Sequence, residues 1–454
     1  MFPVILICLQ REKTVFSGTP GRMLCGLVTA GSARLLATIV IAFSMTVVIA
    51  GCASFSPNPA QKAAYMQRAQ TQSDGAVTVT IAVPSAEETA ALFGLPLDKK
   101  GVQPVWIRVE NRGDIDYLFL PADMDANYFS PQEVAWMYRS GFSSQSKWDM
   151  QVYFDEQSIR LYVPAGETVE GFVHTNKDYG VKYVSAVLYH PGHTKTFEFV
   201  VDVPGIQADF TQVDFDVAVP PESRREVDRE ELRHALEAYP CCVLGPDDET
   251  PGDPLNIVVI GPVDGEVFHP LVRRGWDPTE TITGDTIART VGSSVFRSKY
   301  RTSPVSALFL DGRQQDIALQ KIRSSVDERN HLRLWLTPLI HDGMEVWVGQ
   351  ISRDIGVRFS SKTITTHKID PDVDETREYF LQDMLLSDRL TGIGYVTGVG
   401  GATPEEPRYN YTLDPYFTDG LRLVLFLSKD YASPDDVELV PWNWPGDTAR
   451  GTSQ

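Results

Sequence analysis

Residues 365–378 read TTHKIDPDVDETRE, a stretch whose residue types could bind a metal or perform acid–base chemistry. His367 is followed by Asp370, Asp372 and Asp374, which alternate along the chain. Imidazole and carboxylate groups are ligands of zinc and manganese, and they also act as general acids and bases. The stretch is therefore the first candidate for a functional site.

The sequence excludes one calcium site at this position. An EF-hand loop that began at Asp370 would need Gly at its sixth position and Glu at its twelfth. Glu375 and Leu381 stand at those two positions. The alternating aspartates therefore do not form an EF-hand loop.

The same stretch also has the composition of a helix start. We expect Asp370 to cap the first amides, and Pro371 to occupy the first helical position, where its missing N–H costs nothing. Asp372, Asp374 and Glu375 would then lie near the positive end of the helix dipole. This interpretation explains most of the stretch without any ligand.

Other charged residues occur in or beside predicted strands and could join this stretch in one cluster. The candidate polar site comprises His331, Arg333, Arg353, Asp354, His367, Asp370, Asp372, Asp374 and Asp419. Three interpretations stay open: a structural network of ion pairs, a catalytic or divalent-metal site, and a pocket for a polar ligand. We favour the ion-pair network and expect no cofactor, with a divalent metal as the alternative.

The N-terminal sequence predicts export. Leu35–Ile49 is an apolar run, LLATIVIAFSMTVVI, with Arg34 before it. A basic residue, an apolar run of this length and small residues at the cleavage point are typical of a signal peptide. We expect residues 1–51 to be the signal peptide, with translation starting at Met23.

Cys52 is the predicted lipidation site. Ile49-Ala50-Gly51-Cys52 resembles a bacterial lipobox, which implies lipid transfer to the thiol of Cys52 and cleavage before it. Ala53 follows rather than aspartate, so we expect an anchor in the outer membrane, with the protein facing the periplasm. Residues 52–75 would be the lipid anchor and a polar linker, and the mature chain would have 454 − 51 = 403 residues.

Composition limits the classes of partner. The chain has 43% hydrophobic residues, as globular proteins have, and a formal net charge of −19. Nucleic-acid binding depends on neutralising phosphates with Lys and Arg, so this charge argues against it. We therefore expect no nucleic acid, a membrane contact through the lipid anchor, and a protein partner in the cell envelope.

Cysteine usage is consistent with an exported protein. Once the signal peptide is removed and Cys52 carries lipid, only Cys241 and Cys242 remain, adjacent in YPCCVLG. An oxidising compartment favours pairing, but neighbouring cysteines close no long loop and gain little stability from a disulfide. A vicinal disulfide and two free thiols both stay open.

The fold class that we predict is multidomain, with an N-terminal β-sandwich followed by an α+β, mixed-sheet C-terminal domain. Short strands recur at regular spacing through residues 76–205, including QVYFD at 151–155, and this pattern is typical of a sandwich. A charged connector is expected over 206–240. Long apolar strands mixed with helices then predict the α+β domain over 241–446, before a tail at 447–454.

Ordered motifs in the second half carry a family resemblance. In order, they are Asn256–Gly261, Gly275–Trp276, Pro304–Ser306, Gly312–Asp316, His331–Trp335, Trp347–Gly349, Arg353–Gly356, His367–Asp374 and Tyr416–Gly420. Together they resemble the LssY C-terminal domain family. The resemblance implies a role in the bacterial envelope or in secretion systems, but no defined activity.

Two functions are therefore weighed. The first is a lipid-anchored cell-envelope protein that acts as a binding module, in a secretion or surface-assembly system. The second is an envelope hydrolase that uses the histidines and aspartates of the candidate site. Some members of the family are fused to integral membrane phosphatases, but this chain has a single apolar segment and lacks their PSGH motif. We expect a binding module rather than an enzyme.

Overall fold

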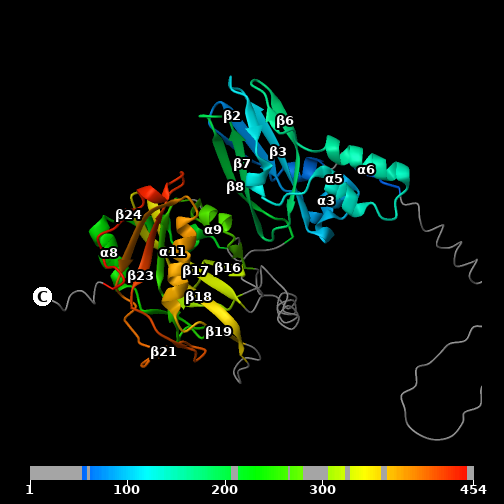
Figure 1. The fold of residues 1–454 in the computed structure, drawn as a ribbon. Helices are drawn as coiled ribbons and strands as arrows, with labels where there is room; N and C mark the ends of the chain where they lie inside the picture. Colours follow the sequence, from blue (N-terminus) through cyan, green and yellow to red (C-terminus); the bar gives the residue numbers. More distant parts are fainter. Residues whose placement is uncertain are drawn as a thin grey trace, which may run out of the picture. The chain divides into compact units, whose positions relative to one another are not determined.

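The computed structural model describes residues 54–58, 62–205, 213–263, 266–279, 305–322, 328–358 and 366–446. These residues are mostly β-sheet, with few helices (Figure 1). None of the helices within these ranges has the length and apolar character that crossing a bilayer requires. The predicted signal peptide, Cys52 and the tail at 447–454 lie outside the described residues.

The N-terminal region, residues 62–205, contains two four-stranded sheets. The first has the order β1 (Gln70–Ser73), β2 (Val77–Ala82), β3 (Val102–Asn111) and β6 (Thr168–Asn176). The second has the order β5 (Tyr162–Val163), β4 (Tyr117–Phe119), β7 (Val181–Tyr189) and β8 (Lys195–Asp202). Alternate apolar residues of both sheets, such as Val79 and Val184, belong to one hydrophobic core. Period-two patterning therefore gives each sheet one buried face.

Helices of the N-terminal region are α2 (Lys62–Met66), α3 (Ala86–Phe93), α4 (Pro121–Met124), α5 (Pro131–Tyr138) and α6 (Ser144–Glu156), with a 3₁₀ turn, η2, at Leu97–Lys100. Ser85 and Ser130 begin α3 and α5 with capping boxes. Gly94 ends α3 in the left-handed conformation, with φ 65°.

The strand predicted at 151–155 was wrong, because this segment lies within α6. Met150 and Phe154 are both buried, and their spacing of four residues is the helical period. The ring of Phe154 stacks on Phe93 of α3 with 5.0 Å between centroids. A run of five residues is too short to distinguish the period of a strand from that of a helix.

The linker predicted at 52–75 is also largely folded where it is described. Tyr65 of α2 is 1% exposed, and β1 pairs with β2 in antiparallel register from Gln70↔Ile81 to Ser73↔Thr78. These residues therefore belong to the fold of the N-terminal region, and the expectation of a free tether was wrong for them.

The C-terminal region, residues 213–446, is built on one ten-stranded mixed sheet. Its order is β13 (Asp277–Pro278), β16 (Ile317–Ile322), β17 (Arg329–His341), β18 (Met344–Arg358), β12 (Ile257–Gly261), β23 (Arg422–Leu427), β20 (Leu390–Val396) and β24 (Glu438–Leu439). β9 (Arg225–Glu226) pairs with β17, and β19 (Thr366–Ile369) pairs with β18. The central strands β12 and β23 run parallel, while β17 and β18 form a long antiparallel hairpin.

Shorter strands complete the region. β10 (Cys242–Leu244), β11 (Pro251–Pro254), β14 (Phe309–Leu310) and β15 (Arg313–Gln314) form a four-stranded sheet, and β21 (Arg408–Tyr409) pairs with β22 (Pro415–Tyr416). The β17–β18 hairpin turns at Asp342 and Gly343, both with positive φ, at 50° and 74°. An Asp-Gly pair is the residue choice that such a tight hairpin favours.

Helices lie on both faces of the large sheet (Figure 1). On one face, Leu334 of β17 shares a core with Phe380 of α11 (Val373–Leu385) and with Leu271 of α9 (His269–Arg273). On the other face, Trp335 shares a core with Leu236 of α8 (Arg229–Ala238). α8 lies in the predicted charged connector, so this part of the connector is built into the C-terminal sheet.

Helix α11 begins two residues later than the sequence predicted. Asp372 is its N-cap and accepts a hydrogen bond from the amide of Glu375 at 3.2 Å. Asp370 instead accepts from the amide of Asp372 at 3.1 Å in a turn. The backbone of Pro371 is held by the amide of Phe417, at 2.9 Å, so the chain is not yet helical there. The prediction of Asp370 as cap and Pro371 as first helical residue was wrong.

Candidate functional site

The structure does not gather the nine candidate residues in one place. His331, Arg333 and Asp354 lie together on one face of the β17–β18 hairpin, whereas Asp374 and Asp419 bind an arginine at the start of α11. Arg353, His367, Asp370 and Asp372 lie at or near the ends of β18, β19 and α11. We describe the two polar networks separately.

The first network lies on one face of the paired strands β16, β17 and β18, together with Asp253 of β11 and with Asn410, which follows β21, and we call it the His331 network. It comprises Asp253, Gln320, Arg329, His331, Arg333, Gln350, Asp354 and Asn410. All eight side chains are buried. The strand residues share one face because they follow the two-residue period, with His331 opposite Gln320 on β16 and Arg333 opposite Gln350 on β18.

His331 and Asp354 form the closest contact of this network. Nε2 of His331 lies 2.6 Å from Oδ2 of Asp354. Nε of Arg329 reaches the same carboxylate oxygen at 3.5 Å, and its Nη1 donates to Oε1 of Gln320 at 2.7 Å. An ionised carboxylate only accepts hydrogen bonds, so this contact places the imidazole proton on Nε2.

A second branch starts at Arg333. Its Nη1 donates to Oε1 of Gln350 at 2.9 Å, and its Nη2 donates to the carbonyl of Ser306 at 3.3 Å. Nε2 of Gln350 donates in turn to Asp253 at 3.3 Å, and Asn410 donates to the other oxygen of Asp253 at 2.8 Å. The amides of Gln350 and Asn410 thus orient the carboxylate of Asp253 toward the face that carries Arg333.

Burial controls the charge state of these groups. It lowers the pKa of His331 to about 4, against the attraction of Asp354, while Arg329 works in the same direction as burial. Burial raises the pKa of Asp253 and lowers that of Arg333, although their opposite charges partly compensate each other. His331 is therefore a neutral imidazole at neutral pH.

Two polar atoms of the His331 network are left unsatisfied. Nδ1 of His331 and Nε of Arg333 are buried and have no hydrogen-bond partner among the described residues. With its proton on Nε2, His331 offers a lone pair on Nδ1, and Arg333 offers an N–H donor. Buried polar atoms of this kind normally find a partner, so a ligand or an ordered water fits here.

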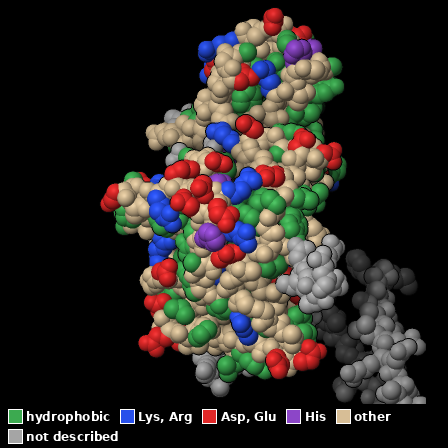
Figure 2. Space-filling model, turned by 90° about the vertical axis from the view of Figure 1, so that its left-hand side faces the viewer, with side chains coloured by type: hydrophobic (Ala, Val, Ile, Leu, Met, Phe, Trp, Pro, Cys, Tyr) green, Lys and Arg blue, Asp and Glu red, His purple; other side chains and the backbone are tan. Residues whose placement is uncertain are grey.

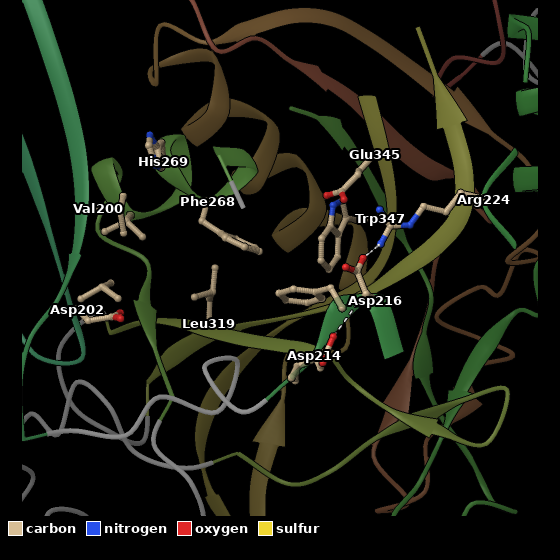
Figure 3. A pocket seen from close by; sticks show the side chains of 14 residues that line it. Val200, Asp202, Asp214, Asp216, Arg224, Phe268, His269, Leu319, Glu345 and Trp347 are labelled. Carbon is tan, nitrogen blue, oxygen red and sulfur yellow. Dashed lines mark hydrogen bonds and ion pairs between the residues drawn. The ribbon is translucent and has the colours of Figure 1, made fainter. Parts of the chain in front are cut away.

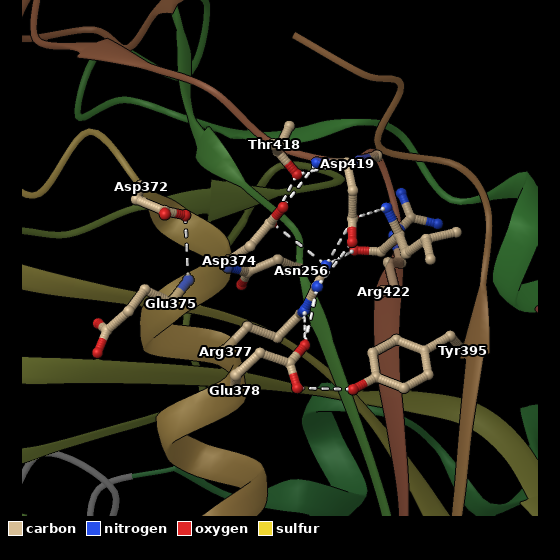
Figure 4. Close-up of polar contacts among 12 residues, drawn as sticks. Asn256, Asp372, Asp374, Glu375, Arg377, Glu378, Tyr395, Thr418, Asp419 and Arg422 are labelled. Atoms are coloured by element: carbon tan, nitrogen blue, oxygen red, sulfur yellow. Dashed lines mark hydrogen bonds and ion pairs between the residues drawn. The ribbon is translucent and has the colours of Figure 1, made fainter. Parts of the chain in front are cut away.

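The second network lies at the start of α11, and we call it the Arg377 network (Figure 4). The Arg377 side chain is 1% exposed and donates from both terminal nitrogens to Asp419, at 2.8 and 2.9 Å. Glu378 accepts from Arg377 at 2.9 Å and from the hydroxyl of Tyr395 at 2.8 Å. Asp374 lies 3.2 Å from Arg377. Three carboxylates thus surround one buried guanidinium.

The carboxylates of this network have further donors. Asp374 accepts from the hydroxyl of Thr418 at 2.7 Å and from the amide of Asp419 at 2.6 Å. Burial would raise the pKa of Asp419, but hydrogen bonds and charge from Arg377 outweigh it and lower that pKa. Burial would lower the pKa of Arg377, but the surrounding carboxylates outweigh burial and raise this pKa. Burial raises the pKa of Asp374, whereas Arg377 and Asp419 hold their charges by mutual pairing, which is a structural role.

The remaining candidates lie at the edges of these elements. Arg353 forms an ion pair with Glu375, donates to Asn330 at 3.1 Å, and lies over the ring of Tyr379. His367 is part of β19, in register with Val357, and its side chain is outside what the structure describes. Whether His367 lies beside His331 is therefore not tested, and the predicted pairing of these two histidines stays a prediction.

Within the described ranges, no three His, Cys, Asp or Glu side chains are grouped in a way that could hold a metal ion. His331 and Asp354 are the two potential ligands that lie closest together in the His331 network.

A separate pocket lies on the opposite face of the hairpin and contains none of the nine candidates (Figure 3). Phe268 and Trp347 form part of its wall, in an edge-to-face contact of 5.8 Å. Asp216 on its border pairs with Arg224 at 2.7 Å. The pocket therefore does not connect the candidate residues.

Cys241 and Cys242 are joined by a disulfide bond in the structure. Arg408 reaches Sγ of Cys241 at 3.3 Å, and the hydroxyl of Tyr416 lies 3.5 Å from Sγ of Cys242. Of the two alternatives that the sequence left open, the structure has the vicinal disulfide.

The sequence analysis missed several members of both networks, namely Asp253, Gln320, Arg329, Gln350, Arg377, Glu378, Tyr395 and Asn410. A signal existed for some of them. Arg329, His331 and Arg333 stand at every second position, and Gln350 and Asp354 stand two positions either side of Ser352 on the next strand. Two strands with polar residues at every second position predict one polar face. Asp253, in the short strand β11, and Asn410, which follows β21, carried no such pattern.

No curated protein matches this chain. The family comparison covers the second half of the sequence, where the model of the LssY C-terminus matches residues 237–421. This range contains the ordered motifs and all nine candidate residues. Residues 237–421 of the chain therefore form an LssY C-terminal-type domain.

Proposed function

We propose that this protein is a lipid-anchored component of the bacterial cell envelope that acts by binding a partner protein. In this proposal, Cys52 carries the lipid at the outer membrane, facing the periplasm. A β-sandwich formed by the N-terminal sheets is followed by an α+β domain of the LssY C-terminal type. The partner belongs to a secretion or surface-assembly system.

The observation that carries a binding role is the low basicity of His331. A histidine with a pKa of about 4 is a poor general base at neutral pH, because catalysis favours a pKa near the working pH. Asp374 and Asp419, the carboxylates of the Arg377 network, are already engaged by one arginine. Asp374 and Asp419, which look catalytic in the sequence, thus stabilise the domain through ion pairs.

The charge distribution supports a protein partner. On the face shown in Figure 2, acidic and basic side chains lie beside one another, without a broad basic area. The net charge of −19 also disfavours nucleic acid. Mixed charge of this kind suits recognition of another protein, in which complementary charges set orientation and specificity.

Cross-linking in intact cells tests the binding role. Cells that carry the full-length chain are treated with an amine-reactive cross-linker, and the products are identified by mass spectrometry. We expect a discrete adduct with one envelope protein, which is lost when Cys52→Ser prevents anchoring. A chain that stays without adducts while it is anchored in the membrane fraction would contradict the binding role.

A second candidate function rests on the unsatisfied atoms of the His331 network. Asp354 accepts from Nε2 of His331 and leaves Nδ1 with a free lone pair, and this is the arrangement of an oriented general base. The candidate is an envelope hydrolase acting on an ester or a phosphate ester. A bound substrate that displaced water and brought a donor to Nδ1 would complete the site.

Turnover and metal content separate the two functions. The full-length protein is assayed with p-nitrophenyl acetate and p-nitrophenyl phosphate, and its metal content is compared with that of a His331→Ala/His367→Ala variant. The binding role predicts no turnover that depends on His331 and no stoichiometric metal. Turnover that disappears in a folded His331→Gln variant, or a bound metal lost from the double variant, would establish the hydrolase instead.

A further inference from the structure

The chain immediately after the predicted lipidation site is fixed to the helices of the N-terminal region. The ring of Phe55 packs edge-on against Tyr153 of α6, with 5.7 Å between centroids. The amide of Asn58 donates to the carbonyl of Ala91 in α3 at 3.0 Å. Phe55 is three residues from Cys52, and an extended chain covers at most about 3.6 Å per residue. A lipid on Cys52 would therefore start within about 11 Å of Phe55.

These helices form one connected layer. The hydroxyl of Tyr153 in α6 donates to the carbonyl of Leu92 in α3 at 2.8 Å. Nε2 of Gln132 in α5 donates to the carbonyl of Gln151 in α6 at 3.2 Å. Figure 1 shows α3, α5 and α6 gathered at one end of the N-terminal sheets. Whatever approaches Phe55 thus also approaches α5 and α6.

Two tryptophans project from this helical layer into solvent. Trp136 of α5 is 59% exposed and Trp148 of α6 is 63% exposed. Trp136 lies four residues after Gln132, and Trp148 lies three residues before Gln151. Each tryptophan is therefore about one helical turn from the contact between the two helices. The inner side of the layer is filled by other residues, including Val134, so core packing does not explain the exposed rings.

Exposed tryptophans beside a lipid attachment point fit the interface of a bilayer. The indole ring has a large apolar surface and one N–H donor, and it accumulates at the level of the lipid headgroups. The guanidinium of Arg139 lies over the ring of Trp136 and could reach a headgroup phosphate while its stem stays on the ring.

We propose that the surface formed by α5 and α6, with Trp136 and Trp148 at its centre, rests on the lipid bilayer. This inference rests on the proposed lipid anchor at Cys52. The occupant is a lipid surface of low charge, because a chain of net charge −19 is repelled by anionic lipids. The protein then stands on the membrane through its N-terminal region and does not hang from a free tether.

Quenching by brominated lipids tests this contact. The full-length, lipidated chain is reconstituted in vesicles of phosphatidylcholine and phosphatidylethanolamine whose acyl chains carry bromine near the headgroup. Trp136 and Trp148 are two of eight tryptophans, so we expect up to about a quarter of the fluorescence to be quenched. Most of this quenching should disappear in a Trp136→Ala/Trp148→Ala variant. Trp444→Phe, which changes a partly buried tryptophan of the C-terminal region, should retain it.

The outcomes separate the anchor from the contact. A chain that carries Cys52→Ser together with Trp136→Ala and Trp148→Ala and still stays in the membrane fraction would refute the proposed anchor. If Cys52→Ser releases the chain but the wild-type protein shows no quenching, the anchor stands and the contact of α5 and α6 with lipid is refuted. Quenching that persists in the double tryptophan variant would also overturn the contact, because other tryptophans would then face the bilayer.

Discussion

The His331 network and the Arg377 network are both built from buried charges within the same domain, yet they differ in how completely these charges are paired. Arg377 is bound by three carboxylates. In the His331 network, Nδ1 of His331 and Nε of Arg333 lack partners among the described residues. A closed network indicates a structural role, whereas an open one leaves room for a ligand.

The two networks also respond differently to protons. Pairing with Asp419 keeps Arg377 charged, against the effect of burial. His331 sits beside one carboxylate and two arginines, and burial keeps it neutral. A change of pH in the mildly acidic range should therefore affect the His331 network first. Substitutions in each network, and unfolding measured across pH, test this difference.

Removing Arg377, the cation at the centre of the Arg377 network, should have the largest effect on the free energy of unfolding. Arg377→Met leaves Asp374, Glu378 and Asp419 without their shared partner, and the loss of one member of a buried ion pair costs about 3–5 kcal/mol. The free energy of unfolding is measured by denaturant titration at pH 7.

Arg229→Met is the matched control, because Arg229 makes an ion pair of similar geometry with Glu438 in which both side chains are nearly half exposed. This control should lose less than about 1 kcal/mol. Equal losses in the two variants would show that the Arg377 network is not a structural centre.

The pH dependence of stability should distinguish the His331 network from the Arg377 network. The folded-state pKa of His331, about 4, lies below its ordinary value of 6.5, so the unfolded chain binds more protons between these two values. Stability should therefore be complete above pH 6.5 and fall as the pH drops toward 4. His331 contributes about 3 kcal/mol to this change in stability if the whole difference between its folded and unfolded pKa is realised.

A His331→Gln variant should lose this part of the pH dependence. His174 has a pKa of about 3, lowered by burial, and contributes with the same sign, so some dependence should remain in the variant. Unfolding is measured at intervals from pH 4 to 7. An unchanged slope in His331→Gln would mean that His331 is charged in the folded protein, with Asp354 as its counter-ion.

Tyr395, at the edge of the Arg377 network, should contribute least to the free energy of unfolding. Tyr395→Phe removes one hydrogen bond, from the tyrosine hydroxyl to Glu378, and should cost about 1 kcal/mol. The loss should be the same at pH 5 and pH 7, since no group that titrates between these values is removed. Tyr431→Phe, at an exposed position, should change nothing. A loss as large as that of Arg377→Met would place the tyrosine at the centre of the network.

Much of the local structure could be predicted from the sequence. Ser85 and Ser130 begin helices with capping boxes that are visible in the sequence, and the alternating run at 76–83 contains β2. Errors arose where a short run fits two periods, as in α6, or where two acidic residues compete to cap one helix, as Asp370 and Asp372 do. Such competition is decided by tertiary contacts, here the hydrogen bond between Phe417 and Pro371.

The candidate site was harder to predict than the fold. The sequence placed Asp374 and His331 in one cluster because charged residues in predicted strands could join the stretch 365–378. The sheet instead places His331 on the face away from α11, and only the pairing of β17 with β18 shows which polar residues meet. Arg377 was missed because a charged residue in a helix is usually exposed, and nothing in its neighbours shows that it is buried.

The parallel pair at the centre of the C-terminal sheet has a consequence for biosynthesis. β12 ends at Gly261, while its neighbour β23 begins at Arg422. Until the ribosome has made β23, one edge of β12 stays open, with buried positions from Ile257 to Ile260 exposed to other chains. Contacts between segments so far apart also form slowly. A fragment that ends at residue 421 would keep that open edge permanently, so fragments for expression should extend beyond β23.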